Sequence, residues 1–324
     1  MKKGSNKRVL LIYIIVILLL FSLFLSGLYV FRRVGEACNR ALEINCYSID
    51  ADTIGEHYSG LRIAQISDLH NVSFDVGNER LLQMLAETQP DMIAITGDLV
   101  DSERTNIDVA ITFAKGAAKI APCFFVIGNN EVAIEEYDRL EEGLKNAGVV
   151  VLHDEAVAFP FNNATIQLIG VDDPYYASYR EKLIRDTAKK VAKEAGASQE
   201  ELERISKALS STQEQQEERY VKKLKNLGIR KEDFTILLSH RPELFEEYCS
   251  IGADVVLTGH AHGGQFRMDG VGGLYAPSQG WFPEYDSGVY HSDDTYMVVS
   301  RGLGNSGFPY RINNPPEIVI VDIQ

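Results

Sequence analysis

Short apolar runs alternate with segments of helical spacing over most of the chain. The runs at 61–67, 92–96 and 123–127 are predicted to be buried strands, because each is short and bounded by polar or turn-forming residues. Helices are predicted over about 107–120 and 134–146, where apolar residues recur at helical spacing. This alternation of strand and helix predicts an α/β fold with a parallel sheet.

The second half of the chain continues this pattern after an interruption. Further strands are predicted at 149–152, 165–171, 234–239, 253–258, 296–300 and 317–322. Between about 175 and 226 the chain is strongly charged, and we predict an insertion of two or three amphipathic helices that break near 196–198 and 210–212. Ser198 and Glu201 have the spacing of a capping box. The insertion is interpreted either as a solvated spacer or as a cap that covers a site or touches a membrane.

The N-terminal segment differs from the rest, because residues 9–31 are almost wholly apolar. A run of this length spans a bilayer as a helix. It ends in Arg32 and Arg33 rather than in a small-residue cleavage site, so a transmembrane anchor is favoured over a cleaved signal peptide. Basic residues precede the run, and Glu36 partly offsets the two arginines that follow it. The positive-inside rule therefore predicts that residues 1–8 are cytoplasmic and that the globular domain lies outside.

Composition argues against nucleic-acid binding and against a zinc site made of cysteines. The chain has 324 residues and a formal net charge of -14 at pH 7, which argues against a nucleic-acid partner. The pattern predicts a connector over 32–59 and a globular domain over 60–324. None of the four cysteines stands in a CxxC pair, so a cysteine zinc site is not indicated. Cys38 and Cys46 lie just past the apolar run, where they can pair outside the membrane.

Residues with metal-binding side chains directly follow several of the predicted strands. In open α/β sheets, ligands bind beyond the carboxyl ends of the strands, so these side chains are expected to meet. Their mixture of imidazoles and oxygen ligands suits manganese, iron or zinc, and the set is larger than one ion needs. Two divalent ions are therefore predicted, with the Asp98 carboxylate as the bridge between them. The candidate ligands are Asp68, His70, Asp98, Asn129, His240, His260 and His262.

A pair of such ions predicts a particular chemistry. The ions neutralise charge on phosphate oxygens and lower the pKa of a bound water, which becomes a hydroxide nucleophile. We therefore expect hydrolysis of a phosphoester or pyrophosphate bond without a covalent intermediate. No Ser-His-Asp arrangement, P-loop or GxGxxG stands where it would support a rival chemistry.

The order of the motifs resembles the calcineurin-like metallophosphoesterase superfamily. The motifs are Asp68-x-His70, Gly97-Asp98-x-x-Asp101, Gly128-Asn129-x-Glu131, His240 and Gly259-His260-x-His262. The stretches 239–243, 259–265 and 300–304 resemble the membrane-associated bacterial branch of that superfamily. Some members of that branch cleave the pyrophosphate of UDP-diacylglucosamine.

This resemblance implies a four-layer α-β-β-α sandwich and a division of the ligands between two metals. The first metal would take Asp68, His70, Asp98 and His262, and the second would take Asp98, Asn129, His240 and His260. Asp101 is expected to support its loop. Arg241 and Arg301 are interpreted either as phosphate contacts or as members of structural ion pairs.

The sequence departs from the family pattern at Asn130, where the family usually has a histidine that assists phosphate binding and leaving-group protonation. An amide donates a hydrogen bond but does not transfer a proton at ordinary pH. Asn130 and Asp98 are the residues expected to act in catalysis. The leading hypothesis is a membrane-anchored, two-metal phosphohydrolase that acts on a phosphorylated small molecule or lipid, with lipid-linked or envelope substrates favoured. A non-catalytic metal-containing sensor or binding module is the alternative.

Overall fold

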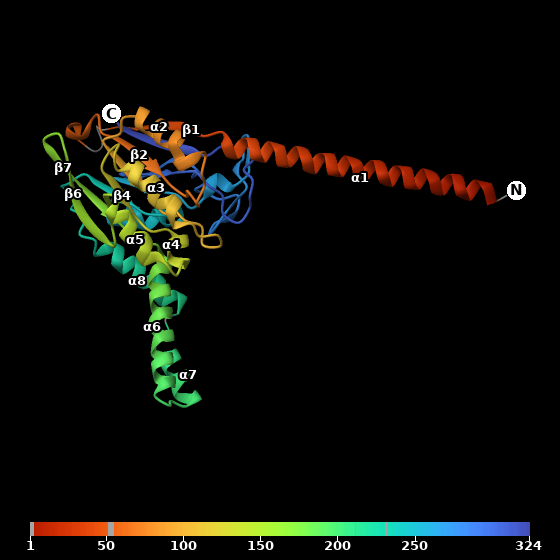
Figure 1. Cartoon of the computed structure of the whole chain (residues 1–324). Coiled ribbons are helices and arrows are strands. Elements are labelled where there is room, and N and C mark those ends of the chain that lie inside the picture. The colour runs from red at the N-terminus through yellow and green to blue at the C-terminus, as the bar shows by residue number, and fades with distance from the viewer. Residues whose placement is uncertain (1–2, 51–54, 211, 231) are drawn as a thin grey trace.

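The N-terminal apolar run forms one long helix, α1 (Lys3–Arg40), which extends away from the other elements (Figure 1). The structure, a computed structural model, describes residues 3–50, 55–210, 212–230 and 232–324. Residues 1–2 of the predicted tail, 51–54 of the predicted connector and Ser211 at a predicted helix break lie outside the described residues. Helix α1 is long and apolar enough to cross a membrane, and its most apolar stretch is not buried against the rest of the protein.

Two six-stranded sheets form the centre of the described part of the chain. The first has the order β1 (Glu43–Ile49), β16 (Glu317–Ile323), β2 (Arg62–Ile66), β3 (Met92–Ile95), β4 (Cys123–Phe125) and β5 (Val149–Val151). The second has the order β14 (Gly288–Ser292), β15 (Thr295–Val299), β9 (Val255–Thr258), β8 (Thr235–Leu238), β7 (Ala164–Gly170) and β6 (Glu155–Phe161). Strands β2 to β5 are parallel, as are β7, β8, β9 and β15.

The sheets pack face to face, and helices cover their outer faces. Side chains of both sheets, such as Ile63 and Ile236, fill the space between them. Phe113 and Leu140 of the helices on the first sheet pack against its outer face, and Tyr248 packs against the second. These layers confirm the predicted four-layer α-β-β-α sandwich.

The helices of the domain connect the strands or lie in the insertion. They are α2 (Glu79–Glu87), α3 (Ile107–Ala117), α4 (Asn129–Ala133), α5 (Tyr137–Asn146), α6 (Pro174–Glu194), α7 (Gln199–Ala208), α8 (Gln213–Lys225) and α9 (Phe245–Ile251). The helix expected over 134–146 begins later, at Tyr137, because Ile134 takes an extended backbone that ends the separate short helix α4. Two small hairpins, β10 (Arg267–Met268) with β11 (Gly272–Gly273) and β12 (Tyr275–Ala276) with β13 (Gly280–Trp281), follow β9.

The segment expected as a connector, 32–59, contains more regular structure than its sequence indicated. Helix α1 continues to Arg40, and β1 then pairs in parallel with β16 at the edge of the first sheet. This pairing joins residues about 270 positions apart in the chain, so the local pattern did not reveal it. Cys38 and Cys46 are both free thiols rather than a disulfide.

The insertion between β7 and β8 is helical, and α6 and α7 form an arm that projects from the domain (Figure 1). The predicted capping box is confirmed, because the backbone N–H of Ser198 donates to Glu201 Oε2 at 2.7 Å and Ser198 Oγ accepts from Glu201 N at 3.3 Å. The last helix of the insertion, α8, returns to the domain, where Tyr220 and Leu224 are buried beside α9. Only part of the insertion is therefore a solvated arm.

Candidate metal centre

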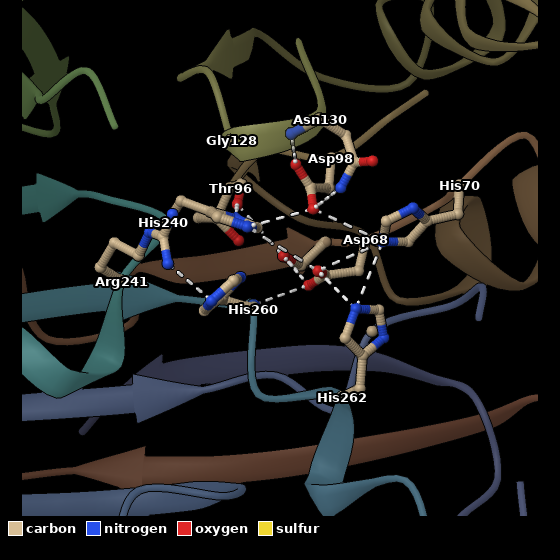
Figure 2. Close-up of polar contacts among 12 residues, drawn as sticks. Asp68, His70, Thr96, Asp98, Gly128, Asn130, His240, Arg241, His260 and His262 are labelled. Atoms are coloured by element: carbon tan, nitrogen blue, oxygen red, sulfur yellow. Dashed lines mark hydrogen bonds and ion pairs between the residues drawn. The ribbon is translucent and has the colours of Figure 1, made fainter. Parts of the chain in front are cut away.

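The candidate ligands from both sheets meet at one edge of the sandwich (Figure 2). Asp68 and Asp98 follow β2 and β3, and Asn129 begins the helix α4 that follows β4. These parallel neighbours end at the same edge of the first sheet, so the three side chains lie close together. The loops after β8 and β9 carry the remaining candidates from the second sheet: His240, His260 and His262. Within the described residues, the ligand atoms gather in two groups, each spanning no more than 4.8 Å: Asp68, His70, His262 and Asp98, His240, His260.

The Asp98 carboxylate lies between the two groups. Its Oδ2 atom is 3.3 Å from His240 Nε2 and 3.5 Å from His70 Nε2. In the first group, His262 Nε2 is 3.3 Å from both Asp68 Oδ1 and His70 Nε2. This placement fits the bridging role that the sequence assigned to Asp98.

Hydrogen bonds at the back of the second group select the ring nitrogens that face its centre. His240 Nδ1 lies 2.7 Å from the backbone carbonyl of Thr96, to which it donates, so Nε2 is the nitrogen that points to the carboxylates. His260 Nε2 lies 2.7 Å from Arg241 Nη1 and accepts from it, which leaves Nδ1 for a ligand. Both rings are thus oriented before any cation binds.

Unpartnered buried atoms test whether these residues suit a metal. Among the described residues, Asp68 Oδ1, Asn129 Oδ1 and His240 Nε2 are buried without a hydrogen-bond partner. Buried polar atoms are rarely left in this state, because each loses its hydration without compensation. Cations would supply the missing partners, and the nitrogen and oxygen donors suit manganese, iron or zinc. The residues present therefore fit two divalent cations.

Charge within the site agrees with this interpretation. Burial alone would raise the pKa of Asp68 and of Asp98, but the surrounding imidazoles hold both below their usual range. Burial lowers the pKa of His262 to about 3, so this ring is neutral and keeps a lone pair at ordinary pH. Burial would also lower the pKa of His240, but the Asp98 and Asp68 carboxylates raise it to about 10, so this ring holds a proton that a bound cation would replace. Ionised carboxylates and neutral imidazoles are the forms that bind metals.

The backbone is strained where the ligands stand. Five of the seven candidate ligands have positive φ angles: Asp68, His70, Asp98, His260 and His262. Residues other than glycine seldom adopt this conformation, and it concentrates at functional sites. Gly259 permits the close approach of the two sheets, because a Cβ there would lie 1.9 Å from Ser67 Oγ and 2.3 Å from Asp68 Oδ2. The backbone conformation at these positions therefore directs the ligands toward a common centre.

Asn130 holds the Asp98 carboxylate in place. Its backbone N–H donates to Asp98 Oδ1 at 2.8 Å, and its side-chain Nδ2 donates to Asp98 Oδ2 at 2.6 Å (Figure 2). Its Oδ1 accepts from the backbone N–H of Ser102 at 3.0 Å. Asn130 thus contacts the centre of the site, as expected for the position where the family has histidine.

The other polar residues of the motifs divide between the site and its surroundings. Asp101 accepts from two backbone N–H groups of its own loop, at 2.9 and 3.0 Å. Arg301 forms ion pairs with Glu317 at 2.9 Å and Glu43 at 3.3 Å. These contacts agree with a role in structural ion pairs rather than in phosphate binding. Arg241 lies within the site, because it contacts His260 as well as a carboxylate partner.

Asp173 and Arg311, which the sequence did not single out, and Glu131 of the third motif also support the site. Asp173 pairs with Arg241, with Nε donating to Oδ2 at 2.5 Å and Nη2 donating to Oδ1 at 3.2 Å; it follows the end of β7, so the strand-end rule applies to it too. Glu131 accepts from the backbone N–H groups of Asp98 and Gly128, each at 2.8 Å. Arg311 is fully buried, and its Nη2 atom lies 3.5 Å from His262 Nδ1. No local pattern in the sequence predicts this role.

A cavity of about 1200 Å³ lies beside the second group of ligands. Arg241 and Ser278 form part of its wall, and both also contact His260. The rest of the wall includes Tyr175 of α6 and Lys222 of α8, so the insertion borders this cavity. The cavity wall contains aromatic, basic and acidic side chains, among them Lys225, Glu243 and Glu247.

Comparisons with known proteins agree with this site. The family model described as calcineurin-like phosphoesterase matches residues 61–264. The metallophosphoesterase YkoQ of Bacillus subtilis is 24% identical over 287 residues, which cover 87% of this chain and 90% of that protein. Phosphodiesterase YaeI of Escherichia coli is 25% identical over 240 residues, 73% and 72% of the two chains. A Danio rerio transmembrane protein with metallophosphoesterase domain is 26% identical, over 83% of this chain and 54% of that protein.

Proposed function

Because the chain belongs to the calcineurin-like phosphoesterase family, we propose that it is a membrane-anchored hydrolase with two divalent cations that cleaves a phosphoester or pyrophosphate bond. The observation that carries the proposal is the Asp98 carboxylate, whose Oδ2 lies within 3.5 Å of an imidazole of each ligand group. The proposed ligands are Asp68, His70, Asp98, Asn129, His240, His260 and His262. Manganese, iron and zinc are the candidate ions.

The protein's own residues position the reaction. When bound, two such cations neutralise phosphate charge and activate water for attack. Asn130 keeps the Asp98 carboxylate fixed between the groups through two hydrogen bonds. Arg241, held by Asp173, presents a guanidinium between the ligand centre and the cavity, where it can bind a second phosphate or the leaving group. A pyrophosphate or a diester therefore suits the site better than a small phosphomonoester.

The membrane part of the proposal rests on α1. Its apolar residues are exposed along the length needed to cross a bilayer, and one relative is named as a transmembrane protein. With the charge bias around the run, we propose that the domain lies outside the cytoplasm, so protease added to intact cells should digest it. An enzyme fixed at the surface in this way favours a lipid-linked or envelope substrate.

The test of catalysis uses the full chain in detergent micelles. With manganese, iron or zinc added, the wild-type protein should hydrolyse a generic aryl phosphodiester, and Asp98→Ala should lose most of this activity and bind less metal. Asp108→Ala is a matched control, because it removes an exposed carboxylate of α3 on the surface. Metal binding without turnover of any phosphoester would favour the sensor alternative instead.

A further inference from the structure

The topology of the first sheet places the end of α1 at the same edge as the metal centre. Strand β1 is parallel to β16, and β16 is antiparallel to β2. Strand β1 therefore begins at the edge where β2 ends and delivers Asp68. In the register, Glu43 pairs with Glu317, two residues beyond the level at which Val319 pairs with Gln65. A helix that enters at Glu43 consequently leaves the domain on the side of the ligands.

The end of the apolar run is packed directly on the domain. The ring of Phe31, its last residue, lies 6.2 Å from the ring of Phe266, 6.4 Å from Phe308 and 6.0 Å from Tyr310. Further along α1, the Asn39 side chain donates to the carbonyl of Pro309 at 2.8 Å and accepts from the backbone N–H of Arg311 at 2.9 Å. In the described part of the chain, α1 continues unbroken from the apolar run to Arg40, so no flexible spacer separates the run from the domain.

Exposed apolar side chains lie on the segments that continue from this junction. We call them the apron; its members are Met268, Val271, Tyr275, Trp281, Phe282 and Phe308. Backbone hydrogen bonds join their segments side by side, because Phe266 O accepts from Leu274 N at 2.9 Å and Leu274 O accepts from Phe282 N at 2.8 Å. Trp281 is 71% exposed and Phe282 65% exposed, which is costly for large aromatic side chains in water.

We propose that the apron contacts the lipid bilayer around α1 and seats the metal centre at the level of the lipid headgroups. This inference rests on the membrane anchoring in the proposed function. A bilayer is the occupant that the geometry favours, because the apron continues from Phe31, the residue at which the apolar run ends. Tryptophan and tyrosine concentrate at membrane interfaces, where the ring is apolar and the polar atom remains hydrated.

The same geometry defines the class of substrate. His262 contacts Arg311, and the neighbouring Tyr310 packs on Phe31, so two residues connect a candidate metal ligand to the end of the apolar run. A lipid with a phosphodiester or pyrophosphate headgroup would thus present its phosphorus to the site while its chains remain in the bilayer. The lipid would not have to leave the bilayer to be hydrolysed.

The test uses Trp281, which is the single tryptophan of the chain. The full-length protein is reconstituted in phosphatidylcholine vesicles, with or without bromine atoms on the lipid chains close to the glycerol backbone. If the apron contacts the bilayer, Trp281 should emit at shorter wavelength than a hydrated tryptophan and should lose most of its emission in the brominated vesicles. The measurement does not depend on catalysis.

A matched variant, Trp281→Phe with Asn163→Trp, serves as the control. Asn163 is exposed in the turn between β6 and β7. Strand β7 begins at this turn and is parallel to β8, so the turn lies at the opposite end of the strands from the ligands. Strands β6 and β7 lie far from α1 (Figure 1). The introduced tryptophan of this variant should emit equally in vesicles with and without bromine. Equal emission from Trp281 in both vesicles, with the protein still floating with them after an alkaline wash, would overturn the apron alone. Failure to float would overturn the anchor and the apron together.

Discussion

At the scale of single residues, Asn130 distinguishes this site from the usual family pattern. Its amide is committed to Asp98, with Nδ2 at 2.6 Å from Oδ2, and it cannot transfer a proton to a departing oxygen. General acid catalysis contributes about 10²–10⁴-fold in rate, and the gain is greatest for poor leaving groups. The wild-type protein should therefore prefer substrates whose leaving group departs unprotonated, such as an aryl alcohol or a nucleotide.

The expected effect of Asn130→His is a selective gain on alkyl esters. A histidine at this position would supply the missing acid, so kcat/KM for alkyl phosphodiesters should rise while kcat/KM for aryl diesters changes less. The measurement is kcat/KM over a series of diesters of graded leaving-group pKa in both proteins. Asn130→Gln, which lengthens the amide without adding an acid, is the control. An equally shallow dependence in wild type and Asn130→His would show that Asn130 does not limit the chemistry.

The metal ligands that the sequence predicted share one property: each stands within a few residues of the end of a strand. Asp68, Asp98 and His240 were found from position alone, since parallel strands end at a common edge. Arg311 was not found, because it reaches His262 from a distant part of the chain. Such contacts depend on tertiary packing rather than on a local pattern. Whether the seven candidates bind metal stays a prediction.

At the scale of elements, the insertion has two parts: α8 packs on the domain, whereas α6 and α7 form the projecting arm (Figure 1). Tyr220 and Leu224 of α8 are buried with Phe245 and Tyr248 of α9, and the Arg241 guanidinium lies 4.7 Å from the centre of the Tyr175 ring. Charge and helical spacing identified the helices, but they did not show which turns return to the core. The strand β1 was overlooked for a similar reason, since its partner is the last strand of the chain.

This division predicts different results for two deletions. Removal of residues 183–217 with a short Gly/Ser linker should leave the fold and the metal content intact, because an ion pair between Glu181 and Arg219 holds the two cut ends near each other. Removal of 175–226 should greatly lower the melting temperature, because it exposes the apolar surface that α8 covers. Thermal unfolding and metal analysis of both proteins check this. Equal melting temperatures for the two deletions would contradict it.

At the scale of the whole molecule, the packing of α1 on the domain fixes the height of the metal centre above the proposed membrane. Phe31 contacts the aromatic residues of the domain, and Asn39 is hydrogen bonded two turns further on. A rigid junction of this kind holds the site at a constant distance from the proposed bilayer, and this distance affects some substrates more than others. A soluble substrate reaches the site at any height, whereas a phosphorus atom in a lipid headgroup does not.

A change in the length of α1 tests whether the distance between the metal centre and the bilayer matters. An insertion of two helical turns between Arg33 and Val34 would lengthen α1 by about 10 Å and lift the domain from the bilayer. Hydrolysis of a lipid phosphodiester or pyrophosphate in vesicles should then fall at least about tenfold, while hydrolysis of a soluble aryl diester should not change. The same insertion on the other side of the apolar run, after Arg8, adds equal length without lifting the domain and is the control. Parallel loss of both activities would indicate damage to the fold, which thermal unfolding would reveal. Unchanged lipid hydrolysis in the lengthened protein would show that the site does not depend on its distance from the membrane, and the rigid packing of α1 would then serve stability alone.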